Sequence, residues 1–347
     1  MQALVLEKKG NVQLRDIDIQ DDLGPEDVRI RPLAVGVCGS DVHYYREGNI
    51  GDFVVRQPMV LGHEAAGAVV EIGSDVKHLK VGDRVCMEPG VPDFTSYEAL
   101  RGMYNLDPSV RFWATPPVHG CLRETVVHPE CLTFKLPDAV SFHEGALVEP
   151  VAIGVYSVNK AGLSSGDTVL VIGAGTIGIV TALAAEAAGC SRVFLADLKK
   201  EKLDFVKKHY REKITGIDLN DSDIKTVLKK HGIESVNVVF EASGSAKAYS
   251  GITQYLQPGG VLVLIGMPSG PVPLDVVGLQ VKEITVKSIF RYVNIFPRVL
   301  DLIASGKLHV KPLITRVFAF KDSCSAFEYA ARLPGGDVKI MIDMEND

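Results

Sequence analysis

The sequence contains no uninterrupted apolar segment of the roughly 18 residues that a membrane-spanning helix requires, because glycine, proline or a charged residue breaks each apolar run. It also lacks a long basic block, since 43 acidic residues outnumber 37 basic ones and the formal net charge is -6. This charge balance offers no electrostatic footprint for nucleic acid or an anionic membrane. The segment Met1–Lys9 predicts a short strand and has neither the apolar stretch nor the cleavage site of a signal peptide. These absences predict a cytoplasmic protein with small-molecule partners, no nucleic acid and no membrane.

Cysteine is sparse and scattered. The six cysteines stand at positions 38, 86, 121, 131, 190 and 324, which form no closely spaced framework. In a reducing compartment they are expected to be thiols rather than disulfides. Most are expected to be packing residues, whereas Cys38 lies in Gly36-Val37-Cys38-Gly39-Ser40-Asp41, a setting that suggests chemistry.

The length of 347 residues exceeds what one core ordinarily uses, so two domains are expected. The first ~150 residues carry short alternating or β-branched runs, such as Val28–Arg31 and Ala68–Ile72, and predict a mostly β domain. From Gly166 onward apolar strands alternate with helical segments, which indicates a parallel sheet with helices on both faces. The strands are expected at Thr168–Ile172, Val193–Asp197, Val236–Phe240 and Val261–Ile265. Past about Arg291 this rhythm weakens, a helix is expected near Pro297, and the tail is expected to return to the first domain.

A glycine turn follows the first of these strands. Gly173, Gly175 and Gly178 form Gly-x-Gly-x-x-Gly, and an apolar helix then runs from Ile177 to Ala188 before Gly189. A strand, glycine turn and helix in this order bind the pyrophosphate of a dinucleotide at the helix N-terminus.

Asp197 ends the second strand, 19 residues beyond Gly178, where a carboxylate accepts hydrogen bonds from the adenosine ribose. A 2′-phosphate would meet a like charge, so NAD is expected in preference to NADP, although Lys199, Lys200 and Lys202 follow closely and could soften the discrimination. The alternative is an aspartate that caps the next helix.

Zinc in a catalytic site takes three protein ligands, and Cys38 and His63 supply two of suitable type. The third is either Glu64 or Glu149, with the other carboxylate one water away. Pro150 predicts an extended backbone at Glu149, which would aim its carboxylate into an interdomain cleft. Found singly, Cys38 would be read as a small buried hydrophobe and His63 as a hydrogen-bonded core histidine. Together, in glycine-flanked turns, they favour a metal site.

The combination of motifs resembles the zinc-dependent medium-chain dehydrogenases, and within them the polyol dehydrogenase group of sorbitol and xylitol dehydrogenases. The motifs are Gly-Val-Cys-Gly-Ser-Asp-Val-His-Tyr, Pro-Met-Val-Leu-Gly-His-Glu-Ala, Val-Gly-Asp-Arg-Val, Met-Glu-Pro-Gly, Leu-Val-Glu-Pro and Gly-Ala-Gly-Thr-Ile-Gly, between Leu4 and about Ile342. The resemblance implies an α/β protein: a GroES-like, mostly β catalytic domain formed by residues 1–153 and 291–347, and a Rossmann, doubly wound NAD-binding domain formed by residues 154–290.

The resemblance also implies site residues. The implied metal ligands are Cys38, His63 and Glu64, with Glu149 on the metal directly or through water. The implied catalytic residues are Ser40 and His43, matching proton-relay positions, and Glu149. The implied substrate residues are Tyr44, Phe53, Phe112, Glu149, Arg291 and Tyr292. The implied cofactor-binding residues are Gly173, Gly175, Ile177, Gly178, Asp197, Lys202, Gly266, Phe290 and Arg291. Without the resemblance, Ser40 would be a turn hydroxyl and His43 a surface residue, and Arg291 could instead serve a subunit interface.

One departure from the resemblance concerns a second, structural zinc that many relatives hold on four closely spaced cysteines. This chain has no cysteine between Cys86 and Cys121, so one catalytic zinc per subunit and no structural zinc is expected. The implied activity is NAD-dependent oxidation of a polyol to a ketose, xylitol to D-xylulose or sorbitol to D-fructose, reversibly, by hydride transfer from a zinc-bound alkoxide to NAD. The implied assembly is a homotetramer. The alternatives are a zinc dehydrogenase acting on threonine, butanediol or a simple alcohol, and a non-catalytic nucleotide-binding relative.

Overall fold

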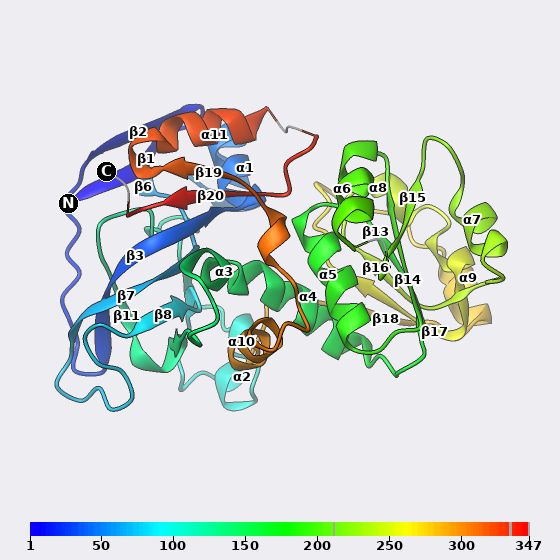
Figure 1. Ribbon diagram of the computed structural model, residues 1–347, viewed down its shortest axis with the longest axis horizontal. Coiled ribbons are helices and arrows are strands. Elements are labelled where there is room, and N and C mark those ends of the chain that lie inside the picture. The colour runs from blue at the N-terminus through cyan, green and yellow to red at the C-terminus, as the bar shows by residue number, and fades with distance from the viewer. Residues whose placement is uncertain (211, 333–334, 346–347) are drawn as a thin grey trace. The chain divides into compact units, whose positions relative to one another are not determined.

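The computed structural model describes residues 1–210, 212–332 and 335–345 (Figure 1). The chain divides into two compact units. The first consists of Met1–Glu149 together with Phe296–Asp347, and the second is the contiguous segment Pro150–Ile295. Among the described residues, no helix is both long enough and apolar enough to cross a membrane.

The first unit is built on a seven-stranded sheet (Figure 1). Its strands lie in the order β12-β8-β7-β3-β20-β19, and β11 also pairs with β3. Their bounds are β3 Asp27–Val37, β7 Glu64–Ile72, β8 Arg84–Met87, β11 Val126–Pro129, β12 Thr133–Lys135, β19 Ile314–Ala319 and β20 Lys339–Asp343. Strand β20 runs antiparallel to β3 with Ile340 opposite Val37, so the C-terminal segment completes this sheet.

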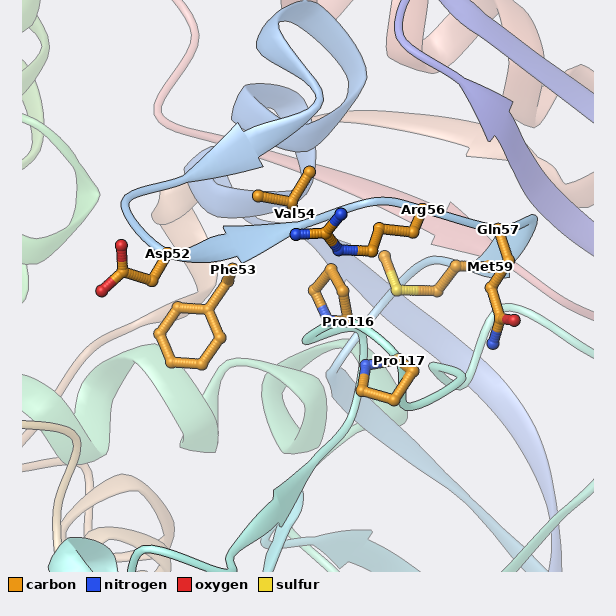
Figure 2. Close-up of a pocket in the computed structure, with 8 residues that line it drawn as sticks. All are labelled: Asp52, Phe53, Val54, Arg56, Gln57, Met59, Pro116 and Pro117. Atoms are coloured by element: carbon orange, nitrogen blue, oxygen red, sulfur yellow. The ribbon is translucent and has the colours of Figure 1, made fainter.

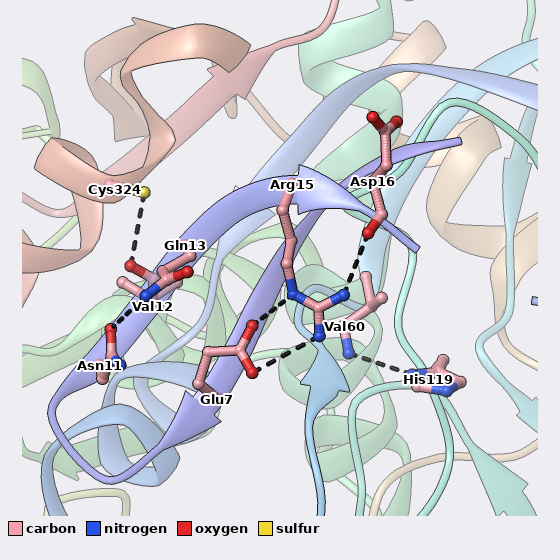
Figure 3. Close-up of polar contacts among 9 residues, drawn as sticks. All are labelled: Glu7, Asn11, Val12, Gln13, Arg15, Asp16, Val60, His119 and Cys324. Carbon is pink, nitrogen blue, oxygen red and sulfur yellow. Dashed lines mark hydrogen bonds and ion pairs between the residues drawn. The ribbon is translucent and has the colours of Figure 1, made fainter. Parts of the chain in front are cut away.

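A three-stranded sheet in the order β2-β1-β6 holds the amino-terminal hairpin. Its bounds are β1 Gln2–Lys8, β2 Asn11–Asp16 and β6 Met59–Val60. Arg15 pairs with Glu7 at 2.5 Å across the hairpin (Figure 3). Cys324, at the start of α11 (Ser323–Ala331), donates a hydrogen bond from Sγ to the carbonyl of Val12 at 3.6 Å. The amino-terminal hairpin and α11 therefore lie side by side.

The remaining elements of the first unit are short. The helices are α1 Gly39–Glu47, α2 Tyr97–Leu100, α3 Phe142–Ala146 and α10 Phe296–Ala304, and the strands are β4 Asn49–Ile50, β5 Phe53–Val54, β9 Gly90–Val91 and β10 Arg111–Phe112. Helix α10 begins one residue before Pro297, as a proline in the first helical turn permits.

The second unit contains a six-stranded, all-parallel sheet in the order β15-β14-β13-β16-β17-β18. The strands are β13 Thr168–Ile172, β14 Arg192–Asp197, β15 Thr215–Asp218, β16 Val236–Glu241, β17 Leu256–Leu264 and β18 Thr285–Ser288. The helices are α5 Thr176–Ala187, α6 Lys200–Tyr210, α7 Ile224–Lys230, α8 Ala246–Tyr249 and α9 Val276–Val281. The strand order reverses beside β13, which is the position where doubly wound sheets bind nucleotides. The predicted α/β fold class is confirmed.

The prediction of an extended backbone at Glu149 is wrong. Helix α4 runs from Val148 to Ala161, so Glu149 and Pro150 lie in its first turn. The amide hydrogens of a first helical turn have no intrahelical acceptor, and proline there sacrifices no hydrogen bond. The steric effect of a proline on the preceding residue is therefore overridden at this helix start.

Candidate metal and cofactor sites

The proposed metal ligands come together from two adjacent strands. Cys38 follows the last residue of β3, whereas Glu64 is the first residue of β7 and His63 directly precedes it. Their ligand atoms lie within 4.8 Å of one another, and His63 and Glu64 are 5% and 0% exposed. A thiolate, an imidazole and a carboxylate gathered in this way suit zinc. The donor set of this chain therefore fits the metal that the sequence predicts.

A glycine leaves space for the third ligand. Gly36 lies opposite Glu64 in the pairing of β3 with β7. A Cβ atom at Gly36 would stand 2.0 Å from Oε2 of Glu64, which is far inside van der Waals contact. The absence of a side chain at Gly36 is therefore required by the Glu64 carboxylate and not by the turn that follows at Cys38.

Asp41 organises both ligand segments, and sequence reasoning missed it. Its carboxylate accepts hydrogen bonds from the backbone amides of Cys38 and Gly62, each at 3.3 Å, and lies 3.4 Å from Nδ1 of His63. A carboxylate beside one ring nitrogen of a metal-binding histidine orients the ring. Burial acts to lower the pKa of His63, but the charges of Asp41 and Cys38 outweigh it and hold this pKa well above its usual value. The only signal in the sequence was the position of Asp41 three residues after Cys38.

Lys339 is a second residue that sequence reasoning missed. Its Nζ donates to both carboxylate oxygens of Glu64 at 2.7 Å and to the carbonyl of Val37 at 3.3 Å. The side chain is buried, and 275 positions separate it from Glu64. Burial acts to lower the pKa of Lys339, but the charges of Glu64 and Cys38 outweigh it and raise that pKa.

Glu149 does not join the group of potential ligands formed by Cys38, His63 and Glu64 among the described residues. It is 6% exposed, and its charge acts on the pKa of both Lys339 and Glu88. Glu149 is thus a buried carboxylate in the electrostatic neighbourhood of the three ligands.

The predicted relay and substrate residues of the first unit lie on several elements. Ser40, His43 and Tyr44 lie on α1, where His43 is exposed and Tyr44 is buried. Phe112 is 8% exposed, and its ring lies 5.6 Å from the His63 ring. Phe112 therefore places apolar surface next to the ring of a proposed ligand.

Phe53 is 44% exposed and lines a pocket of about 310 Å³. Figure 2 shows the pocket between the hairpin that carries Phe53 and the turn at Pro116 and Pro117. Its lining residues are Asp52, Phe53, Val54, Arg56, Gln57, Met59, Pro116 and Pro117, and none of the three candidate metal ligands is among them. Its volume lies at the small end of the range for ligand pockets.

The glycine turn of the second unit has the shape that a pyrophosphate requires. Gly173 has a φ of 105°, and a Cβ at Gly178 would stand 1.7 Å from the carbonyl oxygen of Gly173. A Cβ at Gly175, the N-cap of α5, would meet no atom within 4 Å. The open side of the turn therefore lies at the amide-rich end of a helix, where an anion binds. Ile177 lies within the first turn of the same helix.

Asp197 lies at the carboxyl end of β14 beside this turn. Its carboxylate accepts hydrogen bonds from the amide of Ala174 at 2.5 Å and from the amide of Lys199 at 2.7 Å. Lys202 lies on α6 and is buried. The Asp197 carboxylate thus binds the backbone of the glycine turn and also the backbone of the segment that leads into α6.

Glu241, at the end of β16, is a further residue that sequence reasoning missed. It is 0% exposed, and it accepts hydrogen bonds from the amides of Ser243 and Gly244. A Cβ at Gly173 would stand 2.8 Å from the amide nitrogen of Ser243, so this loop packs on the glycine turn. A Cβ at the predicted cofactor residue Gly266 would stand 2.8 Å from Oε2 of Glu241. The buried carboxylate therefore joins two loops at the carboxyl edge of the sheet.

The remaining predicted residues also lie in the second unit. The guanidinium of Arg291 lies 4.8 Å from the centre of the Phe290 ring, and Arg291 has a φ of 54°, which is uncommon for a residue with a side chain. Tyr292 is buried.

A buried hydrogen bond anchors the cysteine-free lobe of residues 91–106. The hydroxyl of Tyr104 donates to Glu88 at 2.6 Å, and Glu88 is 2% exposed. Burial raises the pKa of Glu88 to about 7. The negative charge of Glu149 also raises this pKa, whereas the hydrogen bond from Tyr104 lowers it. Because the folded pKa lies above the unfolded value, the proton on Glu88 stabilises the fold at low pH, and this contribution is lost as the pH rises to about 7.

We expect Glu88→Gln to stabilise the protein at alkaline pH, because glutamine accepts the Tyr104 hydrogen bond without a charge. The gain in unfolding free energy should be small at pH 5 and reach about 2 kcal/mol at pH 8. Urea unfolding monitored by the single tryptophan, Trp113, checks this, because Trp113 is buried in the first unit. The exposed Glu124→Gln is the matched control, and an equal gain for Glu88→Gln at both pH values would contradict the prediction.

Comparisons with known proteins identify the family of this chain. Residues 24–138 match the alcohol dehydrogenase GroES-like domain, and residues 176–305 match the zinc-binding dehydrogenase family.

The chain is 53% identical to a D-xylulose reductase of Morganella morganii over 333 residues, which cover 95% of this chain and 98% of that protein. It is 42% identical to the sorbitol dehydrogenase of Rattus norvegicus, over 98% of this chain and 95% of that one. The crystal structure of an Escherichia coli oxidoreductase of unknown specificity superimposes with a TM-score of 0.93 at 31% identity, over 99% of both chains. The chain therefore belongs to the zinc-dependent medium-chain dehydrogenases, in their polyol dehydrogenase group.

Proposed function

We propose that this chain oxidises a polyol to a ketose with zinc and NAD, and catalyses the reverse reduction. The convergence of Cys38, His63 and Glu64 within 4.8 Å carries this proposal, in a chain that also has a dinucleotide-binding glycine turn. Xylitol and D-xylulose are the favoured pair, since the similarity to a D-xylulose reductase, at 53% identity, exceeds the 42% to a sorbitol dehydrogenase. Sorbitol and D-fructose are the second pair.

The residues of the first unit hold the metal and manage the proton of the alcohol. Cys38, His63 and Glu64 would hold zinc, which supplies Lewis-acid polarisation of a hydroxyl oxygen when bound. Ser40 and His43 are three positions apart on α1 and so share a face of the helix. A hydroxyl and an exposed imidazole on one face provide a route for a proton to solvent.

The remaining assignments concern orientation. Phe112 excludes water beside His63. Tyr44, Phe53, Glu149, Arg291 and Tyr292 are assigned to the polyol, whose several hydroxyls require donors and acceptors together. The glycine turn, with Lys202, Gly266, Phe290 and Arg291, is assigned to NAD, which supplies the hydride acceptor.

The cofactor preference can be tested at Asp197. We expect Asp197→Asn to lower the preference for NAD over NADP by about tenfold, because the like charge opposing a 2′-phosphate is removed. Asparagine retains one acceptor oxygen, which can serve the amide of Ala174, and loses the acceptor for the amide of Lys199. Dissociation constants for NADH and NADPH, measured by fluorescence titration, report the ratio, and an unchanged ratio would argue against a ribose-binding role.

The function itself is tested by measuring NADH formation before and after a chelator has removed zinc from the protein. The compounds to be tested are xylitol, sorbitol, arabinitol, galactitol, threonine, butanediol and ethanol. Turnover restricted to polyols and lost on removal of zinc is the expected result. Turnover of threonine, butanediol or ethanol instead would retain the metal but reject the polyol assignment. NADH binding without turnover of any compound would favour a non-catalytic relative.

The assembly, location and domain assignments are part of the same proposal. A cytoplasmic homotetramer is inferred, with residues 1–153 and 291–347 as the catalytic domain and residues 154–290 as the NAD-binding domain. Sedimentation equilibrium tests the assembly, and a stable monomer at micromolar concentration would reject it.

A further inference from the structure

Lys339 contacts both segments that provide the proposed metal ligands. Its ammonium lies 2.7 Å from each oxygen of Glu64 and 3.3 Å from the carbonyl of Val37, the residue before Cys38. Lys339 is 3% exposed and Glu64 is 0% exposed, so water screens this pair little.

The sheet fixes Lys339 in this place. It is the first residue of β20, and its neighbour Ile340 lies opposite Val37 on β3. Glu64 lies opposite Gly36 on the other side of β3, and the missing side chain of Gly36 gives the carboxylate its space. The ammonium and the carboxylate are thus held by two strands that flank the strand leading to Cys38.

A carboxylate that is held on both oxygens by an ammonium is a weakened ligand for a metal ion. A divalent cation and the ammonium compete for the same two oxygens, and their like charges repel each other at short range. Without the ammonium, both oxygens of the buried Glu64 carboxylate would be free of their cationic partner. The affinity of such a site for a divalent cation should be higher.

We propose that Lys339 is a positioning residue that competes with zinc for Glu64 and thereby limits how strongly Glu64 binds the metal. The inference rests on the proposed function only in taking Cys38, His63 and Glu64 as the zinc ligands. By drawing charge from Glu64, Lys339 leaves the metal a stronger Lewis acid toward a substrate hydroxyl. Removing this lysine should therefore tighten zinc binding and slow catalysis together.

The test measures zinc affinity directly on the full-length protein. Metal-free wild type, Lys339→Met, Lys339→Gln and Lys339→Arg are titrated with Zn²⁺ against a chromophoric chelator, and the visible spectrum of Co²⁺ bound to each protein is recorded. Lys339→Gln removes the charge and keeps an amide hydrogen-bond donor on a side chain that is one atom shorter. Lys135→Met is the control, because Lys135 is an exposed lysine of the same unit that pairs with Asp83 at 2.9 Å.

We expect Lys339→Met and Lys339→Gln to bind Zn²⁺ about tenfold more tightly than wild type, with a shifted Co²⁺ spectrum and a lower kcat at similar KM. Lys339→Arg retains the charge and should restore the wild-type zinc affinity, and Lys135→Met should leave it unchanged. Should Lys339→Met fail to fold by circular dichroism, Lys339→Gln decides the question. Unchanged or weaker zinc binding in the neutral variants would overturn the inference, whereas wild type that binds no zinc would overturn the proposed function instead.

Discussion

Cys38→Ser is expected to lower kcat/KM for polyol oxidation by at least about 1,000-fold while leaving the dissociation constant for NADH within about twofold of wild type. A serine hydroxyl does not replace a thiolate as a zinc ligand at neutral pH, because it remains protonated. Cys38 belongs to the first unit, whereas the glycine turn lies entirely in the second. Loss of the metal should therefore spare the cofactor.

Zinc content, steady-state kinetics and NADH fluorescence titration together check this prediction. Cys131→Ser is the matched control, because Cys131 is an exposed thiol of the same unit outside the ligand group. Joint loss of activity and NADH binding by Cys38→Ser would show that Cys38 maintains the fold instead. Zinc binding at wild-type stoichiometry by this variant would remove Cys38 from the ligand set.

The second large effect is expected at Gly175. Gly175→Ala should raise the dissociation constant for NADH about 100-fold with little change in stability, because its Cβ would meet no protein atom within 4 Å and would fill the open side of the turn. The backbone at Gly175 has a φ of -69° and a ψ of 178°, which alanine adopts without strain. The variant should keep its zinc and its unfolding free energy within about 1 kcal/mol of wild type.

Two further glycines separate this effect from general damage. Gly216→Ala adds a methyl group in ordinary contact with Leu203 and should leave NADH affinity unchanged. Gly178→Ala would place a Cβ 1.7 Å from a carbonyl oxygen and should destabilise the second unit as well as abolish binding. Wild-type NADH affinity in Gly175→Ala would show that the pyrophosphate does not approach this turn.

The parts of the site that were predictable are those in which a short motif includes its own structural context. The glycine turn is one, because the apolar strand before it and the apolar helix after it lie within about 20 residues of sequence. Confirmation came at β13, which has the predicted bounds Thr168–Ile172, and at α5, which begins at Thr176. Cys38 and His63 were likewise recognisable as candidate ligands from the residue types that zinc requires, and the structure brings them together with Glu64.

The residues that sequence reasoning missed take their roles from distant parts of the chain. The carboxylate of Asp41 reaches the amide of Gly62, 21 positions away, and Lys339 reaches Glu64 across 275 positions. Glu241 acts on its immediate neighbours, but its burial follows from the order of the parallel strands, which no local pattern records. A lysine in a strand is expected to be exposed, and only the neighbouring carboxylate makes its burial tolerable.

Glu149 shows how a sound local rule fails near a helix terminus. The residue before a proline generally avoids helical geometry, and this rule led to the prediction of an extended backbone at Glu149. Val148 already begins α4, and Pro150 falls where the helix needs no amide donor. The sequence alone did not reveal that the helix starts two residues before the proline.

Because β20 is close to the C-terminus, the residues around the proposed metal site are synthesised at very different times on the ribosome. Cys38, His63 and Glu64 are made early, and the contiguous second unit, Pro150–Ile295, separates them in the sequence from the C-terminal segment of the first unit. Lys339 is made among the last residues, and β20 can join β3 only after the whole second unit has been produced. A nascent chain therefore presents Glu64 to metal ions before its ammonium partner exists. Zinc bound at that stage would meet the site without the positive charge of Lys339. Completion of the chain would then lower the zinc affinity of the site.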